Sequence, residues 1–179
     1  MCARSSARPA GGNMTRDTYI RMTGAVRRAV SRLPGGTLWL RMPTYLCAGA
    51  YIAALFYLML LRDIRLIRAL LVPAMCFIVC TILRPLIGRQ RPYDRFAAEP
   101  VGSYRPGKGK SMPSRHTASA AAIAMAVMYI TPSVPLRAAM LLLCAVIAAI
   151  RVLSGQHYVS DVIAALMLSA VLSLIGYSM

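Results

Sequence analysis

Five long runs of apolar residues constrain the fold of this chain more than any other feature. Three of them approach the roughly 20 residues that a helix needs to cross a bilayer, and the third and fourth are shorter. Lipid offers the backbone no hydrogen-bond partners, and the alternation of β-barrel strands is absent, so the runs predict helices. We expect an all-α integral membrane bundle of about five transmembrane helices, at residues 43–61, 66–83, 117–131, 136–150 and 160–179.

The charge balance supports a membrane protein and argues against a nucleic-acid-binding one. The chain has 179 residues, of which 58% are hydrophobic, and it carries 21 Lys and Arg against 5 Asp and Glu. Nucleic-acid binding would explain the basic charge but not the apolar runs. A membrane protein explains both, with apolar spans in the lipid and Lys/Arg loops beside anionic headgroups. We expect a multi-pass protein of the bacterial cytoplasmic (inner) membrane that contacts anionic headgroups. The oligomeric state stays open.

The N-terminal part differs in composition from the rest. Residues 1–15 lack a periodic pattern and predict a disordered basic tail without a cleaved signal peptide. Residues 16–36 alternate apolar and arginine positions at helical spacing and then reach a Pro-Gly-Gly turn. They predict an amphipathic helix on the membrane surface. The transmembrane domain is expected at 38–179.

Counting the spans places polar residues from four helix ends on one face of the membrane. The second span ends there and the third begins there; the fourth ends there and the fifth begins there. Both histidines of the chain belong to this set, which comprises Arg84, Arg91, Ser114, Arg115, His116, Arg151, His157 and Asp161.

The arginines and the start of the third helix suit an anion. Arg84 and Arg91 are cationic forks that can bind phosphate oxygens in pairs, although a basic flank that ends a span explains them equally well. Ser114 marks a helix N-terminus, which favours negative charge, and could equally be an ordinary cap. His116, two residues later, can donate a proton to a leaving oxygen.

A second constellation surrounds the start of the fifth helix. His157 and Asp161 are four residues apart and would share a helix face. Asp161 can hold one ring nitrogen and leave the other free to attack, or the pair can simply cap the helix. Arg151 adds a further cation. So many cations exceed what acyl transfer needs, and they favour phosphoryl transfer, in which negative charge spreads over the phosphate oxygens.

The residues resemble the type 2 phosphatidic acid phosphatases (PAP2), a family that shares its pocket with vanadium haloperoxidases. The family signature is Lys-x6-Arg-Pro, then Pro-Ser-Gly-His, then Ser-Arg-x5-His-x3-Asp. Here the blocks read RPLIGRQRP (84–92), PSRH (113–116) and IRVLSGQHYVSD (150–161). Arg84 stands in place of the usual Lys, Arg115 in place of Gly, and Ile150 in place of Ser.

The resemblance implies roles for these residues. His157 would be the nucleophile that forms a phosphohistidine, Asp161 would orient it, and His116 would protonate the leaving group and then activate water. The remaining set would hold the phosphate: Arg84, Arg91, Ser114, Arg115 and Arg151. Whether Arg115 contacts substrate or lipid headgroups stays open. We expect neither a metal nor a cofactor.

The expected activity is hydrolysis of a lipid phosphate monoester or diphosphate. Candidate substrates are an isoprenoid diphosphate such as undecaprenyl diphosphate, phosphatidylglycerol phosphate and phosphatidic acid. A phosphatase of water-soluble esters and a non-enzymatic membrane anchor or assembly protein are alternatives. The positive-inside rule favours a cytoplasmic site, whereas the resemblance implies an outward-facing one.

Overall fold

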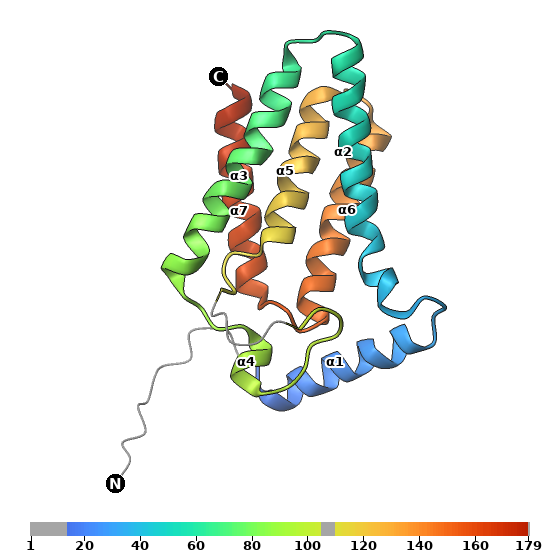
Figure 1. The fold of residues 1–179 in the computed structure, drawn as a ribbon, viewed down its shortest axis with the longest axis vertical. Helices are drawn as coiled ribbons and strands as arrows, with labels where there is room; N and C mark the ends of the chain where they lie inside the picture. The colour runs from blue at the N-terminus through green and yellow to red at the C-terminus, as the bar shows by residue number, and fades with distance from the viewer. Residues whose placement is uncertain (1–13, 105–109, 179) are drawn as a thin grey trace.

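The part of the chain that the computed structural model describes, residues 14–104 and 110–178, consists of helices and the loops between them, which confirms the predicted all-α fold (Figure 1). Most of the predicted tail, residues 1–13, lies outside the described residues. The elements are α1 (Arg16–Ser31), the 3-10 helix η1 (Gly36–Leu40), α2 (Met42–Leu60), α3 (Arg65–Ile87), α4 (Pro92–Phe96), α5 (Arg115–Ile130), α6 (Val134–Leu153) and α7 (Val159–Ser178).

Four of these helices, α2, α3, α6 and α7, are long and apolar enough to cross a membrane. Large apolar side chains along them, such as Ile52, Leu71, Leu142 and Met167, are exposed on the outside of the bundle. A soluble protein of this size rarely exposes so much contiguous apolar surface, whereas lipid tails cover it at no cost. The chain is therefore an integral membrane protein.

Helix α5 occupies the middle of the bundle and packs against α2, α3, α6 and α7 (Figure 1). Its sequence is rich in alanine, and small side chains let neighbouring helices approach closely. With 16 residues it is roughly 24 Å long, shorter than the ~30 Å of a bilayer core. The third predicted span is thus a short central helix that other helices, rather than lipid, surround.

The bundle has two distinct ends, as the sequence predicts. The α2–α3 and α5–α6 turns lie at one end together with the C-terminal end of α7 (Figure 1). The C-terminal ends of α3 and α6 and the N-terminal ends of α5 and α7 lie at the other end, where α1 and α4 cross the bundle. The four helix ends that carry the predicted site residues are therefore on one face.

Two helix boundaries differ from the prediction. Residues 84–113 were expected to form a loop, but α3 continues to Ile87 and stops at Gly88, whose φ of 62° ends the helix and whose N–H donates to the Arg84 carbonyl at 3.1 Å. Within that loop, α4 forms a short helix. His157 was expected on the last helix, but α7 begins at Val159, so His157 lies in the link before it.

Candidate active site

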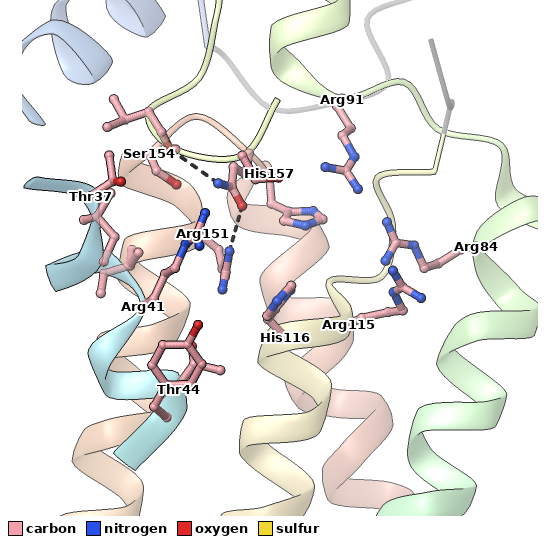
Figure 2. Close-up of a pocket in the computed structure, with 17 residues that line it drawn as sticks. Thr37, Arg41, Thr44, Arg84, Arg91, Arg115, His116, Arg151, Ser154 and His157 are labelled. Atoms are coloured by element: carbon pink, nitrogen blue, oxygen red, sulfur yellow. Dashed lines mark hydrogen bonds between the residues drawn. The ribbon is translucent and has the colours of Figure 1, made fainter. Parts of the chain in front are cut away.

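A cavity of about 420 Å³ opens at the end of the bundle where α1 and α4 lie. Six of the eight predicted site residues line it, and Figure 2 shows their guanidinium and imidazole groups around a common space. The six are Arg84, Arg91, Arg115, His116, Arg151 and His157. No Asp or Glu is among the described residues that line this cavity, so its wall is strongly cationic.

Three arginines of the wall keep hydrogen-bond donors free for a ligand. Arg84 donates to the Lys110 carbonyl, Arg91 to the Tyr93 hydroxyl at 2.9 Å, and Arg151 to Oε1 of Gln156 at 2.8 Å. Within the described residues, the buried Nε atom of each of the three has no acceptor. Buried donors are normally satisfied, so unsatisfied forks from three separate elements indicate an anion site.

His157 is held by the tight link between α6 and α7. The backbone N–H groups of Gln156 and His157 both donate to the Arg151 carbonyl, at 3.2 and 3.1 Å. Gly155 allows this turn because its φ is +76°, and α1 packs so closely on it that an added Cβ would lie 2.6 Å from the Tyr19 hydroxyl. The link therefore fixes His157 at the cavity wall.

The ring of His157 is buried, with 3% of its surface exposed, and its Nδ1 lies 3.5 Å from Oδ2 of Asp161. Burial lowers the pKa of His157 from its ordinary value near 6.5, and the carboxylate of Asp161 opposes this only in part. The imidazole is therefore neutral at neutral pH. Because Nδ1 faces Asp161, Nε2 is the nitrogen left for chemistry.

His116 and Arg115 stand at the start of α5. His116 is exposed and lines the cavity, and Figure 2 shows it between Arg151 and Arg115. Arg115 is half-buried, and its guanidinium carbon lies 5.9 Å from the centre of the Phe77 ring. Both residues also line a second cavity, so they lie where the two cavities meet.

Two predicted site residues lie behind the cavity wall and do not line it. Asp161 is fully buried, and its Oδ2 accepts hydrogen bonds from the Ser111 hydroxyl and from the Tyr158 N–H at 3.0 Å. Its side chain thus reaches back to the residue before α7, as in a capping box. Ser114 is also fully buried; its N–H donates to the Asp161 carbonyl at 3.1 Å, and its hydroxyl accepts from Thr117 at 3.0 Å.

Four further residues belong to the site, and the sequence interpretation missed them. Arg41, which precedes α2, lines the cavity, and Gln156 holds Arg151. Arg89 forms an ion pair with Asp161, and Ser111 donates to the same carboxylate. Arg41 and Arg89 look like ordinary basic flanks in the sequence, so no local signal singles them out.

A bundle of membrane helices with histidines and arginines around one cavity fits a membrane-embedded phosphatase. The sequence model of the PAP2 superfamily matches residues 65–179, so the chain belongs to the PAP2 superfamily. The match includes all of the predicted site residues. A search of curated proteins gives no match.

Two solved structures share the fold. One is a transmembrane PAP2-type phosphatidylglycerolphosphate phosphatase from Bacillus subtilis, with a TM-score of 0.66 and 18% identity over 91% of this chain and 84% of that one. The other is LpxE from Aquifex aeolicus, with a TM-score of 0.66 and 22% identity over 91% of this chain and 94% of that one. Both likenesses extend beyond the family match to include α1 or α2, since they cover nine tenths of the chain.

Proposed function

We propose that this protein removes phosphate from a lipid phosphate monoester or diphosphate. The observation that carries the proposal is a second cavity, of about 360 Å³, that adjoins the first. Its wall is mostly apolar and includes Cys47, Ala48, Phe77, Ala120, Ile123 and Ile147. A phosphate in the cationic cavity and a hydrocarbon chain in the apolar one would fit a lipid, whereas a water-soluble ester has no use for the second cavity.

The two cavities share Thr44, Arg115 and His116 in their walls. A substrate that spans both would carry its scissile phosphate–oxygen bond past His116, where a proton is needed on the leaving oxygen. The same position leaves Arg115 beside the phosphate rather than among headgroups outside. The position of Arg115 in both cavity walls supports a role in substrate binding rather than in headgroup contact.

In the proposed reaction, Nε2 of His157 attacks phosphorus and the phosphate–oxygen bond of the lipid breaks. His116 gives its proton to the departing lipid oxygen. A water molecule then attacks the phosphohistidine, His116 takes a proton from this water, and the nitrogen–phosphorus bond breaks to release phosphate. Arg84, Arg91 and Arg151 offset the charge on the phosphate oxygens throughout, so the chemistry does not call for a metal.

The substrate class includes isoprenoid diphosphates such as undecaprenyl diphosphate, phosphatidylglycerol phosphate and phosphatidic acid. The likeness to a phosphatidylglycerolphosphate phosphatase favours phosphatidylglycerol phosphate as the first substrate to test. A panel of these lipids and of water-soluble phosphate esters, incubated with the purified protein, should show release from lipids only. Preferential release from soluble esters would favour the alternative function.

The assignment of His157 is tested by His157→Ala. This variant should lose all measurable phosphate release yet keep the elution profile of the wild type in detergent, because His157 lies in the link between α6 and α7 and not within a helix of the bundle. Activity of the wild type should survive a chelator and should be blocked by vanadate, which mimics the trigonal-bipyramidal phosphate of the transition state. Turnover by His157→Ala would overturn the assignment of His157 as the nucleophile. A non-enzymatic role would be favoured if substitution of either histidine changed no measured property of the protein.

For the setting of the enzyme, we propose the bacterial cytoplasmic membrane, with the site on the cytoplasmic face. Support comes from α1, whose Arg21, Arg27, Arg28 and Arg32 are exposed at the same end as the site, where anionic headgroups would meet them. A reporter fused after Met179 decides the orientation, because that end of α7 lies opposite the site (Figure 1). A periplasmic signal from this reporter is expected, and a cytoplasmic one would reverse the orientation.

A further inference from the structure

Asp161, the carboxylate beside His157, also forms an ion pair with a residue that is always charged, Arg89. Nη1 of Arg89 lies 2.6 Å from Oδ1 of Asp161, and the Asp161 side chain is completely buried while that of Arg89 is 13% exposed. His157 faces the other oxygen, Oδ2, at 3.5 Å. Asp161 is thus shared between an arginine and a histidine, one on each oxygen.

Arg89 itself is held on several sides. The same Nη1 atom donates to the Ser160 hydroxyl at 2.8 Å, and the guanidinium carbon lies 4.4 Å from the centre of the Tyr158 ring. These contacts all involve the first turn of α7 and the residue that precedes it. Because Arg89 does not line the cavity, it has no direct access to the phosphate there. Its contacts serve the carboxylate and not the substrate.

We propose that Arg89 is a positioning residue for the nucleophile. It fixes the rotamer of Asp161 and offsets its charge, so that Asp161 orients the neutral ring of His157 without stabilising the imidazolium form. The proposal rests on the proposed function for its catalytic meaning, but its physical content is the charge state of His157. A buried carboxylate with no other counter-ion would favour the imidazolium form, which cannot attack phosphorus. A carboxylate already paired with arginine stabilises the imidazolium form far less.

The other charged groups around His157 do not replace this effect. Arg84 of α3, Arg91 before α4, Arg115 and His116 of α5 and Arg151 of α6 line the same cavity, and the charges of Arg91 and Arg84 lower the pKa of His157. Asp161 is the one carboxylate in contact with the ring among the described residues. Arg89 therefore controls the single group that attracts a proton to the nucleophile.

The sign of the expected effect follows from this arrangement. Replacing Arg89 with Gln leaves the Asp161 charge facing His157 and raises the pKa of His157 by about one unit, the lower end of what an opposite charge at contact distance produces. The acidic limb of the kcat/KM profile then moves up by the same amount. At a pH below both limbs, kcat/KM falls about tenfold. Arg89→Lys keeps the charge and should restore most of the profile.

The chain offers a direct readout because it has only two histidines, His116 and His157. In a His116→Gln background, purified without a histidine tag and labelled with carbon-13 histidine, the ring signal reports His157 alone. Its titration midpoint should be higher in Arg89→Gln and Arg89→Met than with Arg89 present, while Arg89→Lys stays near the parent. Met retains the side-chain stem over Tyr158, in case the Gln variant does not fold. Arg68→Gln, at an exposed position of α3, the helix that precedes Arg89, is the charge-matched control.

The outcomes separate this inference from the proposed function. An unchanged His157 midpoint in folded Arg89→Gln or Arg89→Met overturns the positioning role, whatever the protein hydrolyses. A raised midpoint supports it even if no lipid of the panel is a substrate. In the enzyme with both histidines, a loss of activity that is uniform across pH would mean that Arg89 only supports the structure, and it would also overturn the proposal.

Discussion

The arginines at the two ends of the bundle differ in what they contact. At the end away from the cavity, Arg65 pairs with Asp63 at 2.7 Å and donates to the Ile130 carbonyl at 3.1 Å. Arg137 donates to the carbonyls of Thr131 and Met128 at 2.7 and 2.9 Å. These acceptors lie at the C-terminal end of α5, where carbonyls lack partners within the helix. Arg65 and Arg137 therefore cap the C-terminal end of α5.

At the cavity end, three arginines keep hydrogen-bond donors that have no acceptor in the described part of the protein. Arg84, Arg91 and Arg151 each hold one acceptor and keep a buried Nε without one among the described residues. Keeping unpaired cations partly buried lowers stability, and a protein gains from it only if a ligand completes the pairs. The comparison teaches that Arg65 and Arg137 use their donors on protein acceptors, whereas the three arginines of the cavity wall each keep a donor that an anion could satisfy.

Arg151→Gln should produce the largest change. The substitution removes a cation from the cavity wall, and the loss of one such donor typically lowers kcat by about 10²–10³-fold. The melting temperature in detergent should stay the same or rise, because a buried charge with an unsatisfied donor is removed. Phosphate release and thermal unfolding of the same preparation check both. A normal rate would show that Arg151 does not hold the phosphate.

Arg137→Gln should behave in the opposite way. It leaves the carbonyls of Met128 and Thr131 without their donor, and each hydrogen bond to a charged group contributes about 1.5–3 kcal/mol at most. The melting temperature should fall while kcat/KM stays within about twofold of the wild type, because the residue lies at the far end of the bundle. A large loss of activity without a loss of stability would break the contrast between the two ends.

Arg115→Gly should have a smaller effect on activity than Arg151→Gln. It restores the residue that the family usually carries and removes a half-buried cation at the junction of the two cavities. We expect KM for a lipid phosphate to rise by about tenfold with little change in kcat, since an interaction made equally in the bound and transition states affects only KM. Phe77→Leu, which removes the ring beside Arg115, serves as a milder companion variant.

The sequence could predict which residues meet because membrane helices alternate in direction. Once the five runs are assigned, Arg84, His116, Arg151 and His157 must lie at one end, and the structure confirms that they line one cavity. The charge pattern alone could not show that Arg41 lines the same cavity, since a phosphate contact and a membrane flank have the same side chain. Only the folded structure brings Arg41 to the site.

The contacts behind the cavity wall could not be predicted. Arg89 and Asp161 are 72 residues apart, and their pairing depends on how the segment after α3 folds over the start of α7. The position of His157 outside α7 likewise depends on the Gly155 turn and on the close approach of Tyr19 from α1. Ser114, predicted to hold phosphate, is instead fully buried against Asp161 and Thr117 in the structure, so its predicted contact with phosphate stays a prediction.

The central claim is that His157 carries the phosphate during turnover. The most direct test mixes the purified enzyme with a lipid phosphate from the panel, stops the reaction in base within the first turnover, and maps the modified peptide by mass spectrometry. Phosphohistidine survives base and is lost in acid. The account predicts phosphate on His157 that is absent from His157→Ala and is lost after acid treatment. Phosphate release by the wild type with His157 unmodified throughout the first turnover would contradict it.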